Sequence, residues 1–109
     1  MRLVVIESPY AGDVEANETY ARRALADSLA RGEAPLASHL LYTQPGVLDD
    51  TDPKQRLQGI EAGFSWGEKA DLTAVYVDRG TSAGMEMGIA ASKAAGRPVE
   101  FRSIGGEDE

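Results

Sequence analysis

The chain has 109 residues, of which 42% are hydrophobic, so it suits one compact domain and leaves no room for two. A formal net charge of -7 speaks against binding polymeric DNA or RNA, and the absence of cysteine excludes a disulfide scaffold or a thiolate metal site. No apolar stretch approaches the roughly 20 residues that span a bilayer, so we expect a cytoplasmic protein without membrane contact.

Strand and helix signals alternate in the first half of the chain. An apolar, β-branched run over residues 2–6 predicts a buried first strand. The break at residues 8–12 precedes a helix over about residues 14–30, with an aspartate placed to cap it. Residues 34–41 are expected to form a second strand. The long turn that follows, residues 42–51, is interpreted as a folded-back lid or an oligomer contact.

The second half continues the same alternation. An Asp-Pro pair at residues 52–53 opens a helix, and residues 72–77 predict a third strand. A glycine-containing turn at residues 80–84 leads into a third helix, and residues 99–102 predict a fourth strand. Such alternation demands right-handed crossovers. We therefore predict an α/β fold: a short parallel sheet of four strands in the flavodoxin/Rossmann-like order 2-1-3-4, with helices on both faces.

The expected ligand site lies at the carboxyl edge of this sheet. Three loops, residues 8–13, 38–42 and 78–86, follow strands and should converge there, where open parallel sheets bind their ligands. A single mononucleotide is compatible with the net charge, because helix-terminal N–H groups and one arginine can hold it. We assign residues 1–104 to a single domain and residues 105–109 to an acidic, disordered tail.

The third loop and the helix after it carry the most informative residues. Glycines allow close approach of the backbone to a ligand, and Thr81 or Ser82 can cap the helix so that its first N–H groups point into the cleft. Glu86 lies in the first turn, where the helix dipole stabilises a carboxylate and suits it to nucleophilic attack. The alternative is that Glu86 only stabilises the helix.

Three further side chains are candidate ligand contacts. Tyr10 can stack on a base or hydrogen-bond a sugar, or it can simply close the edge of the core. His39, the only histidine, has no second metal ligand nearby in the sequence, so a hydrogen bond to ligand or loop backbone is the expected role. Arg79 is placed for a 5′-phosphate. We expect no metal and no cofactor.

The segment around Glu86 resembles a known family. Residues 84–90 (Gly-Met-Glu-Met-Gly-Ile-Ala) follow a strand that ends in Asp78 and precede Gly-Arg-Pro-Val, and this combination resembles the signature of nucleoside 2-deoxyribosyltransferases. Related N-glycoside hydrolases acting on deoxynucleoside monophosphates share that fold. In the family the glutamate attacks the anomeric carbon and an aspartate assists. The resemblance implies Glu86 as the nucleophile and Asp78 as an acid or sugar-hydroxyl ligand.

The resemblance extends to the start of the chain. Residues 7–12 (E-S-P-Y-A-G) and 38–44 (S-H-L-L-Y-T-Q) are similar to small, mostly phage-type, uncharacterised members of the superfamily. Together, the loops and the resemblance give a set of expected substrate-binding residues: Ser8, Pro9, Tyr10, Gly12, Asn17, His39, Arg79, Gly80, Thr81, Ser82, Gly84 and Met85.

A second register of the resemblance leads to a different function. It aligns Gly84 and Met85 with the G-[AT]-x-x-E pattern of other relatives, and it places Gly88 where the glutamate belongs, so the pocket would bind without cutting. One hypothesis is therefore an enzyme that cleaves or transfers at the N-glycosidic bond of a (deoxy)nucleoside or its monophosphate. The other is a module that captures a nucleotide-derived ligand; a structural protein that kept only the fold is a third. In each case we expect a homo-oligomer.

Overall fold

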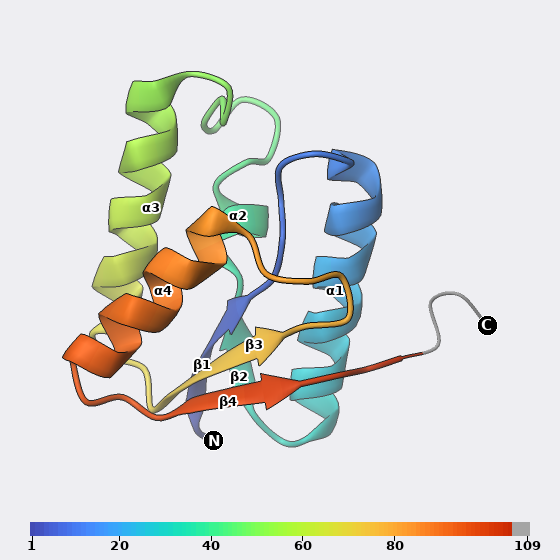
Figure 1. Cartoon of the computed structure of the whole chain (residues 1–109), viewed down its shortest axis with the longest axis vertical. Helices are drawn as coiled ribbons and strands as arrows, with labels where there is room; N and C mark the ends of the chain where they lie inside the picture. The colour runs from blue at the N-terminus through green and yellow to red at the C-terminus, as the bar shows by residue number, and fades with distance from the viewer. Residues whose placement is uncertain (106–109) are drawn as a thin grey trace.

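The computed structural model describes residues 1–105, so the expected acidic tail lies, after Gly105, outside the described residues. Figure 1 shows the arrangement of the elements. In chain order they are β1 (Leu3–Glu7), α1 (Val14–Ala30), β2 (Ala34–Leu36), α2 (Ser38–Leu41), α3 (Pro53–Gly67), β3 (Leu72–Tyr76), α4 (Ala83–Ala94) and β4 (Val99–Arg102).

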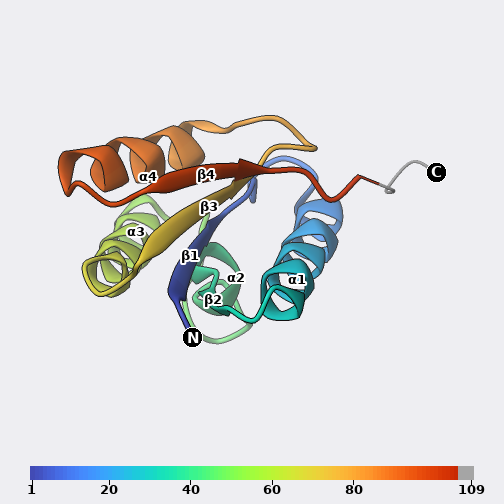
Figure 2. The ribbon, with the colours of Figure 1, turned by 90° about the horizontal axis from the view of Figure 1, so that it is seen from below.

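The four strands form one parallel sheet in the order β2-β1-β3-β4, which confirms the predicted topology. Helix α1 covers one face of the sheet, and α3 and α4 cover the other (Figure 2). This arrangement follows from right-handed crossovers, because the connection from β1 to β2 runs in the opposite direction across the sheet to the two later ones. The carboxyl ends of all strands therefore meet at one edge.

Alternate residues of the strands build two separate cores. Val4 and Ile6 of β1 lie on the α1 face, where they pack with Tyr20 and Tyr76 in the larger core cluster. A smaller cluster of Val75, Met85 and Ile89 lies between β3 and α4. Because side chains alternate along a strand, Glu7 belongs to the α4 face.

Helix α4 packs closely on the sheet through small residues. Gly88 and Ser92 are buried on its inner side, and the Ser92 hydroxyl lies 2.7 Å from Thr73 Oγ1 of β3. The Ser82 side chain accepts a hydrogen bond of 3.2 Å from the Met85 N–H and so caps the helix, as one of the two predicted caps. The first turn of α4 is therefore fixed at the carboxyl edge.

The predicted second strand is wrong in its second half. Strand β2 ends at Leu36, and Ser38–Leu41 forms the short helix α2. The cause is packing against α3: a Cβ atom on Gly63 would lie only 2.9 Å from the Ser38 Cβ atom, so α2 and α3 meet at a glycine. His39 consequently stands on a helical turn rather than at the end of a strand.

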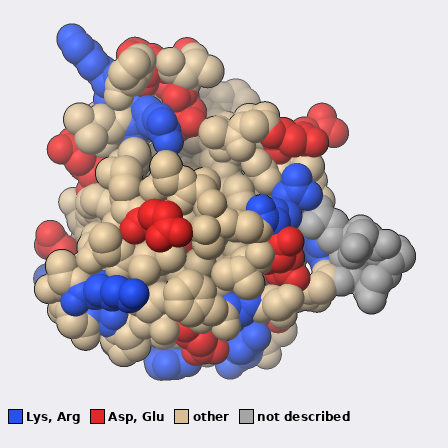
Figure 3. Space-filling model, viewed as in Figure 1, with Lys and Arg blue, Asp and Glu red and all other residues tan. Residues whose placement is uncertain are grey.

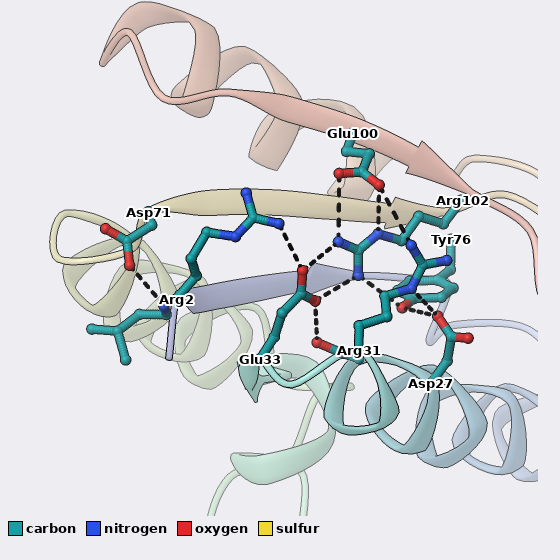
Figure 4. Close-up of polar contacts among 10 residues, drawn as sticks. Arg2, Asp27, Arg31, Glu33, Asp71, Tyr76, Glu100 and Arg102 are labelled. Carbon is teal, nitrogen blue, oxygen red and sulfur yellow. Dashed lines mark hydrogen bonds and ion pairs between the residues drawn. The ribbon is translucent and has the colours of Figure 1, made fainter.

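A buried network of charges ties β4 to the start of β2 on the α1 side of the sheet (Figure 4). Arg102 donates two hydrogen bonds of 2.8 Å to the carboxylate of Glu33, one to each oxygen. Arg102 Nη1 also lies 3.2 Å from the Tyr76 hydroxyl, which donates to Asp27 at 2.7 Å. Bidentate pairing of this kind satisfies both buried charges.

Two further observations concern the whole described chain. Among residues 1–105 there is no helix of the length and apolar character needed to cross a membrane. Over the face that carries α4 and β4, acidic and basic side chains are scattered among uncharged ones and form no large patch of one sign (Figure 3).

Candidate functional site

A pocket of about 240 Å³ opens at the carboxyl edge of the sheet. Its walls come from the loop after β1, from α2, from the inner side of α3 and from the first turns of α4. This is the position at which the three loops were expected to converge. The volume is somewhat below the roughly 300–1,000 Å³ of typical small-molecule sites.

Glu7 and Gly88 meet at the sheet side of the pocket. Glu7 is the last residue of β1, and Gly88 lies on the buried side of α4 directly opposite. A Cβ atom at position 88 would overlap the carboxyl group of Glu7, including both of its oxygens. The glycine therefore leaves the space that the Glu7 carboxyl group occupies.

Burial controls the protonation of Glu7. Removal from water raises the pKa of Glu7 to about 8, although the positive charge of Arg97 acts in the opposite direction. No hydrogen bond from the described residues contributes to this pKa. The carboxyl group is consequently protonated at neutral pH and has a proton to donate into the pocket.

A serine–histidine pair forms the neighbouring wall. The Ser8 hydroxyl lies 2.6 Å from His39 Nε2, so α2 and the end of β1 are joined at the pocket. Burial lowers the pKa of His39 to about 4, which leaves the imidazole neutral at physiological pH. A neutral ring with one engaged nitrogen can exchange hydrogen bonds with a ligand but offers no positive charge.

Positive charge reaches the pocket from Arg97 and Arg56. Arg97 is fixed by hydrogen bonds of 3.0 Å to Thr73 Oγ1 and 2.6 Å to the Gly67 carbonyl. Arg56 of α3 is largely exposed, and its Nε atom lies 4.0 Å from Asp50. With the N-terminus of α4 nearby, these groups provide an anion-binding side to the pocket.

The pocket brings together half of the residues that the sequence nominated as substrate contacts. Those that line it are Ser8, Tyr10, His39, Ser82, Gly84 and Met85. Those outside its lining are Pro9, Gly12, Asn17, Arg79, Gly80 and Thr81.

Asn17 and Arg79 support the first loop from behind. The Asn17 amide donates to the carbonyl groups of Tyr10 and Ala11 at 3.0 and 3.1 Å, and Arg79 Nε donates to Asn17 Oδ1 at 2.9 Å. Gly12 turns the same loop with a φ of 99°, in the left-handed region that favours glycine. These residues position Tyr10 at the pocket.

Asp78 holds the segment that follows β4. Its carboxylate accepts hydrogen bonds from the Tyr20 hydroxyl at 2.5 Å, from the Ile104 N–H at 3.0 Å and from the Gly105 N–H at 2.7 Å. Together with a bond from Ser103, these donors hold the pKa of Asp78 well below its ordinary value. Its carboxylate is outside the pocket lining and is already occupied.

Glu86 is exposed and is also outside the pocket lining, although it stands in the first turn of α4 as expected. Gly88, rather than Glu86, is among the residues that line the pocket. The catalytic role expected of Glu86 stays a prediction, and the structure offers a second carboxyl group, Glu7, inside the pocket.

Glu7, Arg56 and Arg97 line the pocket but are not among the site residues expected from the sequence. A signal for Glu7 does exist, because an acidic residue that ends an apolar parallel strand must stand at the carboxyl edge. Its contact with Gly88 has no local signal, since the two residues lie far apart in the chain. Among residues 1–105 there is no group of three or more metal-ligating side chains.

The class of protein is defined by the sheet and its edge: a small, Rossmann-like α/β domain with a ligand-sized pocket where the carboxyl ends of its strands meet. Residues 2–102 match a family model described as Domain of unknown function (DUF7768), and the chain belongs to this family. No curated protein matches the sequence.

Solved structures that share this fold include two 2-deoxyribosyltransferases and a CMP N-glycosidase. A 2-deoxyribosyltransferase from Bacillus psychrosaccharolyticus is 20% identical with a TM-score of 0.66, and the match covers 96% of this chain and 74% of that one. A 2-deoxyribosyltransferase from Leishmania mexicana is 15% identical, with a TM-score of 0.62 and coverage of 96% and 66%. A CMP N-glycosidase from Clostridium botulinum is 13% identical, with a TM-score of 0.55 and coverage of 94% and 71%. At these identities the likeness establishes the shared fold.

Proposed function

We propose that this chain is an enzyme that cleaves or transfers at the N-glycosidic bond of a nucleoside or nucleoside monophosphate. The observation that carries the proposal is the carboxyl group of Glu7 inside a pocket at the carboxyl edge of the sheet, where burial raises its pKa to about 8 and so favours the protonated form at neutral pH. Breaking this bond develops positive charge on the sugar and negative charge on the leaving base, and a positioned acid assists the departure of the base. The fold shared with deoxyribosyltransferases and a CMP N-glycosidase supports the same reaction class.

The lining suggests how a nucleotide would lie. Tyr10 and Phe64 offer aromatic surface for a base, and Ser8 with His39 offers hydrogen-bonding groups for sugar hydroxyls. Arg56 and the N-terminus of α4 suit a 5′-phosphate. A monophosphate is therefore expected to bind more tightly than the free nucleoside.

The test is a survey of base release. Purified protein is incubated with ribonucleosides, 2′-deoxynucleosides and their 5′-monophosphates, with and without an added acceptor base, and the products are separated by chromatography. Release of base without an acceptor identifies a hydrolase, and exchange of bases identifies a transferase. No release and no exchange at high enzyme concentration would contradict the proposal.

A matched pair of variants controls for contaminating enzymes. Ala83 is exposed at the mouth of the pocket, whereas Ala90 is exposed on the same helix away from it. Ala83→Trp should obstruct the pocket and abolish the activity, while Ala90→Trp should leave it unchanged. Equal activity of both variants would place the reaction in another protein of the preparation.

Binding without turnover is the second candidate function. The specific observation in its favour is that Gly88, rather than Glu86, stands beside the pocket. Calorimetry with nucleotides, cyclic nucleotides and ADP-ribose-like compounds tests it. Tight binding with the ligand recovered unchanged would favour this candidate over the enzyme.

We also propose a homo-oligomer, on two features of the surface. Strand β4 is an edge of the sheet, and Phe101 on it and Trp66 on α3 are each more than half exposed. Light scattering measures the assembly, and a monomer at working concentration would contradict the expectation.

A further inference from the structure

We infer that Glu7, at the end of β1, is the proton-donating catalytic residue of this pocket, and that Gly88 on α4 is the residue that makes room for it. The inference rests on the proposed function and specifies which carboxyl group reacts. It differs from the role that the sequence resemblance gives to Glu86. The inference links Glu7 on β1 with Gly88 on α4, two residues that lie far apart in the chain.

The Glu7 carboxyl group lies where a side chain at position 88 would lie. Even a Cβ atom there would overlap it. Gly88 lies within α4 and its φ is not positive. The backbone conformation therefore does not require glycine at this position. The observed position of the Glu7 carboxyl group therefore depends on the missing side chain at position 88, because a side chain there would displace it.

The groups around the Glu7 carboxyl group leave it available to a ligand. The ionisable groups that line the pocket with Glu7 are Tyr10, His39, Asp50, Arg56 and Arg97. Of these groups, Arg97 is the one whose charge acts on Glu7, and its donors are already engaged by Thr73, Gly67 and Ser92. No hydrogen bond from the described residues contributes to the pKa of Glu7, so the hydrogen-bonding capacity of its carboxyl group is available to a ligand in the pocket.

The Glu7 carboxyl group can act as a general acid on the leaving base. As the bond between C1′ and the base nitrogen breaks, its electron pair moves to the base, and the Glu7 carboxyl group donates its proton to the base. A water molecule then adds to C1′, and the proton that this water loses returns to the Glu7 carboxylate. In a transfer reaction, an acceptor base replaces water and supplies its own N–H proton. Each cycle restores the protonated acid.

The experiment combines activity with a stability cycle. The proteins are wild type, Glu7→Gln, Glu7→Ala, Glu86→Gln, Gly88→Glu, the double variant Glu7→Ala/Gly88→Glu, and Glu61→Gln as the control on an exposed part of α3. Base release is measured on the 2′-deoxynucleoside 5′-monophosphates of adenine and cytosine, and each protein is also assayed for binding of these compounds and for its thermal midpoint.

We expect Glu7→Gln to bind the monophosphates within a few-fold of wild type but to release base at least ~100-fold more slowly. The wild-type rate should fall as the pH rises through about 8, where Glu7 loses its proton. Gly88→Glu alone should lower the midpoint, while the double variant should recover it and regain part of the activity that Glu7→Ala loses. Glu61→Gln should match wild type.

Each opposite result is decisive. Activity that survives in Glu7→Gln but is lost in Glu86→Gln would overturn the inference and leave the proposed function standing. Midpoint changes that simply add in the double variant would overturn the pairing of the two positions. Absence of turnover in wild type would overturn the proposed function together with the catalytic role, and the midpoints would still decide the pairing.

Discussion

Glu7 and Glu33 lie on opposite sides of the sheet, and their surroundings shift their pKa values in opposite directions. Glu33 receives two hydrogen bonds from Arg102, one of 2.9 Å from Arg2 and one of 2.8 Å from Ser28, and these partners lower its pKa to about 2. Glu7 receives no such partners and burial raises its pKa to about 8. The same side chain is therefore a fixed anion in one place and a neutral acid in the other.

The difference separates a structural role from a functional one. All of the acceptor capacity of Glu33 is used to join β2, α1 and β4, so nothing remains for a ligand. Glu7 opposes folding whenever it is charged, and a protein keeps such a group where function benefits from it. Four experiments test this contrast.

The largest effect is expected from breaking the Glu33 network. Arg102→Met keeps most of the side-chain volume but leaves the Glu33 charge buried without its main partner, which should cost about 3–5 kcal/mol of unfolding free energy. Urea unfolding measures the loss. Arg31→Met is the control, because the Arg31–Asp27 pair is partly exposed and should contribute less than about 1 kcal/mol. Similar losses in the two variants would contradict the contrast.

The next effect concerns Glu7 and alkaline pH. The pKa of Glu7 is higher in the folded state than its ordinary value of 4.5, so its contribution to stability is complete below pH 4.5 and is lost as the pH rises through about 8. Glu7→Gln cannot ionise and should therefore unfold more than ~10 °C higher than wild type at pH 9 and at a similar temperature near pH 4. Thermal scans across this range measure it. An equal shift at both pH values would show that ionisation is not the cause.

A smaller effect is expected from the capping of α4, which holds Gly88 opposite Glu7. Ser82→Ala removes the side-chain acceptor for the Met85 N–H and should cost about 1 kcal/mol. Ser65→Ala on the exposed surface of α3 is the control and should change stability by less than about 0.5 kcal/mol. Chemical denaturation of the two variants provides the comparison, and equal losses would contradict the role of the cap.

The last experiment perturbs the protein least, because it is a titration without any substitution. Burial lowers the pKa of His39 from 6.5 to about 4, so this residue contributes stability above pH 6.5 that is lost as the pH falls toward 4. Because His39 is the only histidine, its ring protons can be followed by NMR without assignment. A midpoint near 6.5 in the folded protein would show that the pocket wall is open to water at this position.

The sequence predicted the framework because its signals are local. Apolar runs marked the four strands, and the alternation with helices predicted a parallel sheet; the structure confirms the predicted order 2-1-3-4, which the alternation alone does not determine. Helix α2 was missed because a four-residue helix has no periodicity to detect, and its conformation depends on the approach of Gly63.

The site was harder to predict because its main contacts are not local. Asp78 was correctly placed at the carboxyl edge, but no sequence pattern shows that residues 103–105 return to occupy its carboxylate. The sequence shows Glu7 at the end of the first apolar run and Gly88 in the helix that contains Glu86. Only the packing of α4 on β1 shows that the Glu7 carboxyl group occupies the space beside Gly88.

The shared space at positions 7 and 88 also constrains how this family can change. A side chain at position 88 would displace the Glu7 carboxyl group from the place it occupies, whereas a small residue at position 7 would free that space. We therefore expect the two sites to vary together, and homologues that carry a carboxylate at the helix position should favour alanine or glycine at the end of their first strand. Covariation between these two alignment columns would be the evolutionary trace of a reactive group that has changed its place in the chain while keeping its place in the pocket.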